Sequence, residues 1–107
     1  MENIIFITIQ HFEGCPNGPK MINNVKTAMS SLPFIFDYKE QLIETNDEAA
    51  RVHFRGSPTL LINGIDFENT KNPCNPSLTC RIYIDGIPSP IEISKKIVEI
   101  VENKNIK

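Results

Sequence analysis

The sequence has no cluster of lysine or arginine, no long apolar run and no internal repeat. Its 107 residues carry 11 basic and 13 acidic side chains, which leave a formal net charge of -2. Because no basic stripe could follow a phosphate backbone, nucleic acid is not an expected partner. No segment approaches the roughly 18 to 20 apolar residues that span a bilayer, so no membrane association is expected either.

The first residues also lack the features of a signal peptide. The apolar run at 4–9 is short, follows no basic region and precedes no small-residue cleavage site. We therefore expect a cytoplasmic protein with reduced cysteines. The length, with 40% hydrophobic and 22% charged residues, is that of one globular domain covering residues 1–107.

The three cysteines and two histidines have no spacing typical of a zinc site, so no metal is expected. Met21 stands six residues after Cys15, where a phosphatase loop would need an arginine. Cys74 and Cys80 could resolve an intermediate on Cys15, bridge each other, bind metal or have no role. Because the cytosol is reducing, we expect both to remain thiols.

The first half of the chain predicts a strand, a helix and a second strand. Residues 4–9 are an unbroken β-branched and aromatic run, typical of a central strand covered on both faces. Apolar residues then recur at helical spacing from 22 to 32, and Pro33 ends this amphipathic helix. Residues 34–43 are aromatic and apolar with a polar middle, which indicates a strand at a sheet edge.

The middle of the chain predicts a short helix and another buried strand. Thr45 and Glu48 form a capping box, so a helix to about Phe54 should follow, with His53 and Arg55 on its surface. Residues 59–62 are a buried-strand run that stops at an Asn-Gly turn. We expect this strand to pair antiparallel with residues 81–85, although the turn could instead start a short hairpin with residues 65–68.

A second capping box predicts the last helix. Ser89 and Glu92 flank Pro90 at the first helical position, and apolar residues follow at helical spacing: Ile93, Ile97, Ile100 and Val101. The predicted order is therefore βαβαββα, an α/β fold with a four-stranded mixed sheet flanked by helices.

Two motifs carry a resemblance to the thioredoxin-like superfamily. The stretch Phe-Arg-Gly-Ser-Pro-Thr-Leu-Leu-Ile at 54–62 resembles the cis-proline region of thioredoxins. The turn Glu-Gly-Cys-Pro-Asn-Gly at 13–18 lies between a strand and a helix, where that superfamily places its Cys-x-x-Cys. With Asp66-Phe67 and the segment 80–83, the chain is similar to a small prokaryotic family, some members of which carry selenocysteine at Cys15. The resemblance implies a thioredoxin-like fold, a cis bond before Pro58 and redox chemistry.

The chain departs from the thioredoxin pattern at two positions. Gly18 stands where the second cysteine would be, so Cys15 has no resolving thiol in its own turn. Ile9 replaces the buried acid that thioredoxins carry six residues before the nucleophile. Both departures point away from a dithiol cycle and toward a monothiol route.

Cys15 is the expected nucleophile. If it caps a helix beginning at Pro16, the unsatisfied N–H groups there would favour the thiolate, while Glu13 would oppose it. His11, at the end of the first strand, could change the reactivity of the Cys15 thiol, or it could be a solvated or core histidine with no such role. The alternative for Cys15 is an inert cysteine buried under the helix.

Six further residues are expected to bind substrate. Pro16 lies beside the nucleophile, and Ser57, Pro58 and Thr59 form the cis-proline loop. A cis bond would turn the Ser57 backbone outward, where it could pair with an extended peptide or with glutathione. By analogy with glutaredoxin-like proteins, Gly86 and the helix start at Ser89 could hold a carboxylate, or Ser89 could be a simple structural cap.

These expectations lead to a thiol oxidoreductase with a single active-site cysteine that acts on a disulfide or a peroxide. Its partner would be a protein or small-molecule thiol or disulfide. It would hold no permanent cofactor, and glutathione or another thiol would complete turnover. The alternative is a non-catalytic thioredoxin-fold module that binds a peptide or protein partner in the same groove.

Overall fold

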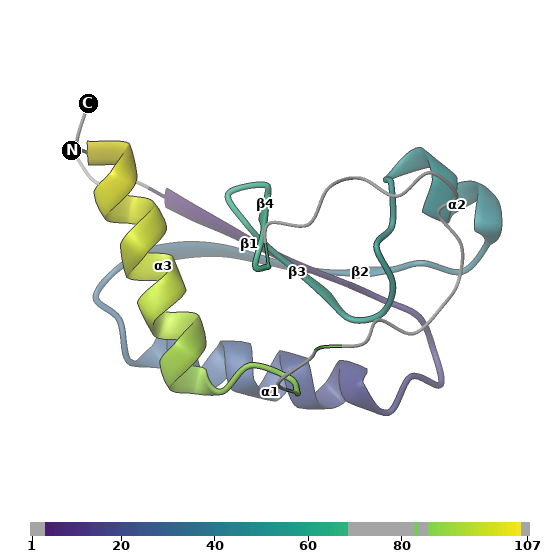
Figure 1. The fold of residues 1–107 in the computed structure, drawn as a ribbon, viewed down its shortest axis with the longest axis horizontal. Helices are drawn as coiled ribbons and strands as arrows, with labels where there is room; N and C mark the ends of the chain where they lie inside the picture. The colour runs from purple at the N-terminus through teal and green to yellow at the C-terminus, as the bar shows by residue number, and fades with distance from the viewer. Residues whose placement is uncertain (1–3, 69–82, 84–85, 106–107) are drawn as a thin grey trace.

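The computed structural model describes residues 4–68, 83 and 86–105, and this part of the chain forms an α/β fold (Figure 1). The described elements follow the predicted order βαβαββα, but the fourth described strand comes from residues 65–66 and not from residues 81–85. The elements are β1 (Ile4–His11), α1 (Asn17–Ser30), β2 (Ile35–Leu42), α2 (Asn46–Arg51), β3 (Thr59–Ile62), β4 (Ile65–Asp66) and α3 (Pro90–Asn105).

The four strands form one mixed sheet in the order β2-β1-β3-β4. β1 runs parallel to β2, with Ile4 opposite Ile35, and antiparallel to β3, with Ile9 opposite Leu60. Because β1 has a neighbour on both sides, its inward residues are among the most buried of the chain. β2 lies at an edge, as its polar middle predicted.

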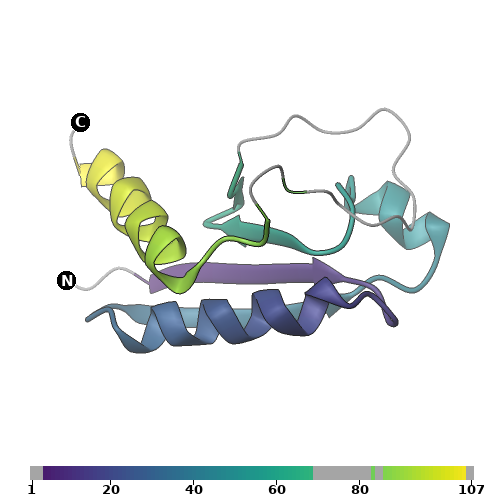
Figure 2. The ribbon, with the colours of Figure 1, turned by 60° about the horizontal axis from the view of Figure 1, so that its bottom comes forward.

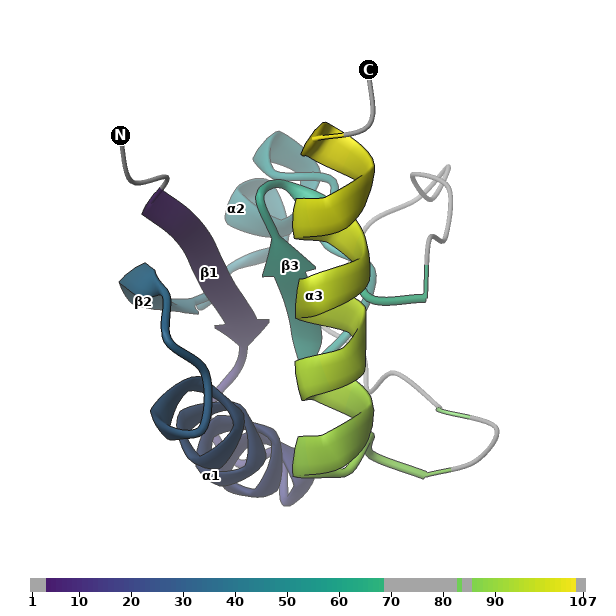
Figure 3. The ribbon, with the colours of Figure 1, turned by 90° about the vertical axis from the view of Figure 1, so that its left-hand side faces the viewer.

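α1 and α3 pack against each other on one face of the sheet (Figures 2 and 3). The apolar core lies between these helices and the strands. Its members are Ile5, Ile7, Ile9, Met21, Val25, Ala28, Leu60, Ile62, Tyr83, Ile93, Ile97 and Ile100. α2 lies beyond the end of the sheet where β1 and β2 finish, and it packs a smaller cluster of Ile43, Ala49 and Phe54 (Figure 1).

The edge strand β2 is tied to α1 by a polar cluster. The Tyr38 hydroxyl donates to Glu40 at 2.8 Å, and the Lys26 ammonium lies 3.8 Å from the same carboxylate. Lys26 also lies 5.6 Å from the centre of the Tyr38 ring. Burial, with the hydrogen bond and charge of Glu40 adding to it, raises the pKa of Tyr38 well above its usual range, so this hydroxyl stays a donor.

The predicted capping box of α2 is present with one difference. Thr45 Oγ1 accepts from the Glu48 N–H at 3.1 Å, as expected. The Glu48 carboxylate, however, accepts from the N–H of Glu44 at 2.9 Å, one residue before the cap. The start of this helix was therefore predicted correctly, and the returning hydrogen bond was predicted one residue too late.

α2 ends at Arg51, three residues earlier than expected. His53 adopts a left-handed conformation with φ of 54°. The His53 and Phe54 N–H groups then bond back to the Ala50 and Ala49 carbonyls at 3.3 and 2.8 Å, which is a Schellman ending. The expectation that His53 and Arg55 lie on a helix surface is therefore wrong, because both follow the helix.

The Asn-Gly turn starts the short hairpin that was the alternative expectation. Asn63 and Gly64 both have positive φ, 52° and 81°, as a type I′ turn requires, and β4 pairs with β3. Asn63 also anchors the hairpin to β1, since its N–H donates to the Phe6 carbonyl at 2.7 Å and its Oδ1 accepts from the Phe6 N–H at 2.8 Å. The expected pairing with residues 81–85 falls outside the described residues, apart from Tyr83.

α3 begins with the complete capping box that the sequence predicts. The Ser89 N–H donates to Glu92 Oε1 at 2.9 Å, and the Glu92 N–H donates to Ser89 Oγ at 3.2 Å. Pro90 is the first helical residue. Among the described residues, no helix combines the length and apolar character needed to cross a membrane.

Candidate functional site

Cys15 lies in the turn between β1 and α1. Its N–H donates to the Phe12 carbonyl at 3.4 Å, and its own carbonyl accepts from the Gly18 N–H at 3.2 Å. Only 5% of the residue is exposed. Its thiol donates to the Ser57 carbonyl at 3.6 Å, so the sulfur is held against the loop that precedes β3.

The expectation that Cys15 caps the helix is wrong. α1 begins at Asn17, its N-cap is Pro16, and no side chain caps it, because the Cys15 thiol is directed to Ser57 instead. The first turn of α1 contains no acidic residue. The positive end of the helix dipole near Cys15 is therefore not neutralised from within the helix.

The peptide bond between Ser57 and Pro58 is cis, as the resemblance implied. The Ser57 hydroxyl accepts from the Phe12 N–H at 3.3 Å, and the Ser57 carbonyl accepts from the Cys15 thiol. Ser57 is fully buried. The expected outward turn of its backbone is therefore not observed, because both of its oxygens have partners inside the protein.

Tyr83, which comes after the cis-proline loop in the chain, also contacts this loop. Its hydroxyl donates to the Pro58 carbonyl at 2.6 Å, and the residue is 8% exposed. The Thr59 hydroxyl donates to the Gly56 carbonyl at 2.6 Å from a fully buried position. The sequence predicted no role for Tyr83. The available signal was a tyrosine between two isoleucines, because a tyrosine that becomes buried needs a partner for its hydroxyl.

Tyr83→Phe should lower the free energy of unfolding by about 1–3 kcal/mol, because the buried Pro58 carbonyl loses this donor while the ring volume is kept. Urea unfolding measures the loss. Tyr38→Phe is the matched control, since its hydroxyl bonds an exposed carboxylate, and it should change stability by less than about 1 kcal/mol. Equal effects of the two variants would contradict a supporting role for Tyr83.

The remaining expected binding residues lie at different distances from Cys15. Pro16 adjoins it and is exposed. Gly86 closes a turn by donating its N–H to the Tyr83 carbonyl at 3.0 Å. The Asn24 side chain donates to the Pro88 carbonyl at 2.9 Å, so the start of α3 lies beside the middle of α1. Asn24 is about 10 Å along α1 from the first residue of that helix, Asn17. The structure thus brings Ser57 to the thiol and engages Ser89 in the α3 capping box.

Gly18 and His11 are neighbours at the start of α1. Gly18 is buried, and a Cβ at this position would lie 3.6 Å from the Nδ1 of His11, an ordinary van der Waals distance. Position 18, where the resemblance would place a second cysteine, therefore has room for a Cβ. Its being glycine does not follow from a steric requirement.

A cavity of about 220 Å³ adjoins the Cys15 turn. It is lined by Phe12 and Glu13, which follow β1, and by Ile43 and Glu44, which follow β2. Phe12 is the residue whose carbonyl and N–H bond Cys15 and Ser57, respectively. The cavity wall, the cysteine turn and the cis-proline loop are therefore joined by hydrogen bonds.

No protein-family model, no curated protein and no solved structure matches this chain. Within residues 4–68, 83 and 86–105, no three histidine, cysteine or acidic side chains converge as a metal site would need. The expectations for Cys74 and Cys80 fall outside the described residues.

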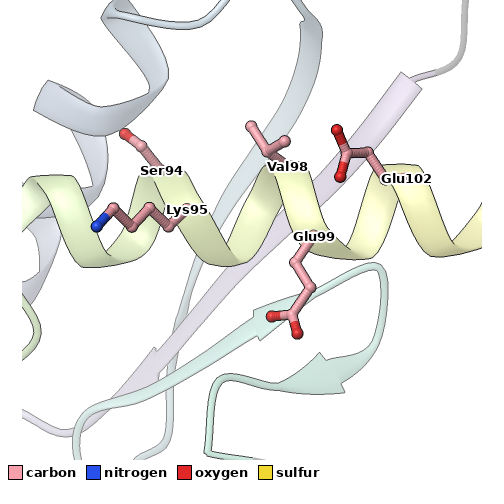
Figure 4. Close-up of a pocket in the computed structure, with 5 residues that line it drawn as sticks. All are labelled: Ser94, Lys95, Val98, Glu99 and Glu102. Atoms are coloured by element: carbon pink, nitrogen blue, oxygen red, sulfur yellow. The ribbon is translucent and has the colours of Figure 1, made fainter.

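A second cavity, of about 340 Å³, lies along α3 and is lined by Ser94, Lys95, Val98, Glu99 and Glu102 (Figure 4). Figure 4 shows these side chains spreading to different sides of the helix. They include no thiol. This hollow is therefore a weaker candidate for chemistry than the smaller one beside Cys15.

Proposed function

We propose that this protein is a thiol oxidoreductase of thioredoxin-like fold that acts through Cys15 alone. The observation that carries the proposal is the pairing of the Cys15 thiol with the Ser57 carbonyl next to the cis Ser57–Pro58 bond. The strand order, with one parallel and two antiparallel pairs, is compatible with this fold. The proposed compartment is the cytoplasm, where thiol reductants are abundant.

In the proposed reaction, Cys15 loses its proton and attacks one sulfur of a disulfide. The old S–S bond breaks, a mixed disulfide forms on Cys15, and the departing thiolate takes up a proton. An external thiol such as glutathione then attacks the mixed disulfide and releases Cys15. This second step needs an external partner because Gly18 supplies no resolving thiol.

The buried position of Cys15 affects how the reaction starts. The Cys15 S–H group donates a hydrogen bond to the Ser57 carbonyl. This hydrogen bond must break when substrate binds and the thiolate forms. The N-terminus of α1, which begins two residues after Cys15, then offers a partial positive charge beside the sulfur. In this proposal, Pro58 and the exposed Pro16 flank the sulfur on which the substrate docks.

The test is a glutathione-coupled disulfide reduction assay. The wild-type protein should show activity, and Cys15→Ser should reduce it to background, because oxygen does not form the mixed disulfide. Cys74→Ser and Cys80→Ser are the matched controls and should retain activity. Activity that survives Cys15→Ser would refute the proposal.

The buried thiol and the glycine at position 18 favour one other function, a thioredoxin-fold module that binds a peptide or protein without exchange. This function predicts no reductase activity in the wild type. It also predicts that Cys15→Ser leaves partner binding unchanged.

A further inference from the structure

The cavity beside Cys15 lies at the carboxyl ends of the two parallel strands. Phe12 and Glu13 come directly after β1, and Ile43 and Glu44 come directly after β2. In α/β sheets, ligands bind outside the carboxyl ends of the strands. The position of this 220 Å³ cavity is thus that of a binding site, and it has an apolar part (Phe12, Ile43) and an acidic part (Glu13, Glu44).

The two carboxylates in this lining are uncompensated. Among the described residues, neither Glu13 nor Glu44 forms an ion pair, whereas the neighbouring Glu48 pairs with Arg51 at 4.0 Å. Among the described residues that line the cavity, none is a lysine or arginine. The described part of the lining is therefore acidic, and it adjoins the turn that carries Cys15, two residues after Glu13.

We propose that this cavity receives a positively charged group of the substrate, an ammonium or a guanidinium close to the disulfide that Cys15 attacks. The inference rests on the proposed function and defines its substrate class as cationic disulfides, in preference to anionic ones. Phe12, which is partly exposed, contacts the aliphatic part of that group, and the exposed Glu13 and Glu44 neutralise its charge.

The test compares three small disulfides that differ in charge: cystamine, bis(2-hydroxyethyl) disulfide and 3,3′-dithiodipropionate. In each case the Cys15 thiolate forms a mixed disulfide and releases one thiolate. Tryptic mass spectrometry follows Cys15 separately, because it lies in the peptide 1–20 while Cys74 and Cys80 share the peptide 72–81. The rate for cystamine divided by the rate for dithiodipropionate gives the charge preference.

Glu13→Gln and Glu44→Gln should each lower this ratio by about threefold, and the double variant by about tenfold, since each removes one nearby negative charge. Comparing variants cancels the different intrinsic reactivities of the disulfides. Glu102→Gln is the matched control, because it changes the net charge equally on α3, whose last turn lies at the opposite end of the molecule from α2 (Figure 1). It should leave the ratio unchanged.

The preference should also shrink when salt is raised from 0.05 to about 0.5 M, because both carboxylates are exposed to screening. A ratio that the double variant does not change would overturn the inference while leaving the proposed function intact. Failure of Cys15 to react with any of the three disulfides would instead overturn the proposed function.

Discussion

Gly18→Cys is expected to convert the monothiol turn into a dithiol that closes an internal disulfide with Cys15. The Gly18 N–H bonds the Cys15 carbonyl at 3.2 Å, which closes a turn and keeps the two Cα atoms within about 7 Å, near the range that a disulfide accepts. A Cβ at position 18 meets nothing closer than 3.6 Å. Resolution of the mixed disulfide then becomes intramolecular: the new thiol at position 18 attacks the Cys15 sulfur, the substrate thiolate leaves, and an internal disulfide forms that the external thiol later reduces. In a single turnover without external thiol, release of the second half of the substrate should therefore be at least roughly tenfold faster than in the wild type.

The matched control is Gly18→Ala, which adds the Cβ without a thiol. It should leave turnover unchanged and raise stability by roughly 0.5–1 kcal/mol, since glycine in a helix is less favourable than alanine. Mass spectrometry after oxidation should show the loss of two hydrogens in the peptide 1–20 of Gly18→Cys only. If Gly18→Cys and Gly18→Ala give the same rates and neither loses two hydrogens, the Cys15 thiol does not face the side chain at position 18.

Ile97→Ala is expected to lower the free energy of unfolding by about 2–5 kcal/mol. Ile97 is fully buried in the core that joins α3 to α1 and the sheet, so truncation removes apolar contacts and leaves a cavity. Domains of this size have about 5–15 kcal/mol of stability in total, so the loss is a large part of it. Urea unfolding monitored by circular dichroism measures the change.

The matched control for this variant is Ile91→Ala in the first turn of the same helix, where the residue is 69% exposed. It makes the same chemical change outside the core and should alter stability by less than about 0.5 kcal/mol. A loss for Ile97→Ala no larger than this would show that α3 does not depend on the packing seen here.

The proposed monothiol mechanism and the proposed charge preference depend on different residues near the same turn. In the proposed mechanism, Cys15 supplies the reacting sulfur, and the cavity formed by the residues that follow β1 and β2 selects the disulfides by charge. A variant with unaltered Cys15 and no carboxylates at positions 13 and 44 should therefore still form the mixed disulfide while it loses its charge selectivity. Because glutathione carries a net negative charge, the proposed second step should also be faster in this variant.

The local pattern of the sequence determined most of the elements, and it left open whether the strand after residues 59–62 is 65–68 or 81–85. A capping box acts through hydrogen bonds between residues three apart, and a proline at a first helical position or an Asn-Gly pair acts through its own backbone conformation. Ser89, Pro90 and Asn63 could therefore be interpreted without the rest of the chain. The cis bond before Pro58 was predicted from a resemblance, and the polar middle of residues 34–43 was enough to place that strand at an edge. The early end of α2 escaped prediction because a histidine takes the left-handed conformation that usually belongs to glycine.

Only the tertiary structure decided what surrounds the sulfur. The contact of Cys15 with Ser57, the support of Pro58 by Tyr83 and the meeting of Glu13 with Glu44 join residues 25 to 42 positions apart. Such contacts depend on strand register and helix packing, which have no local signature in the chain. For the same reason the sequence could not tell a capping cysteine from a buried one, because the direction of that side chain is set by the loop that packs against it.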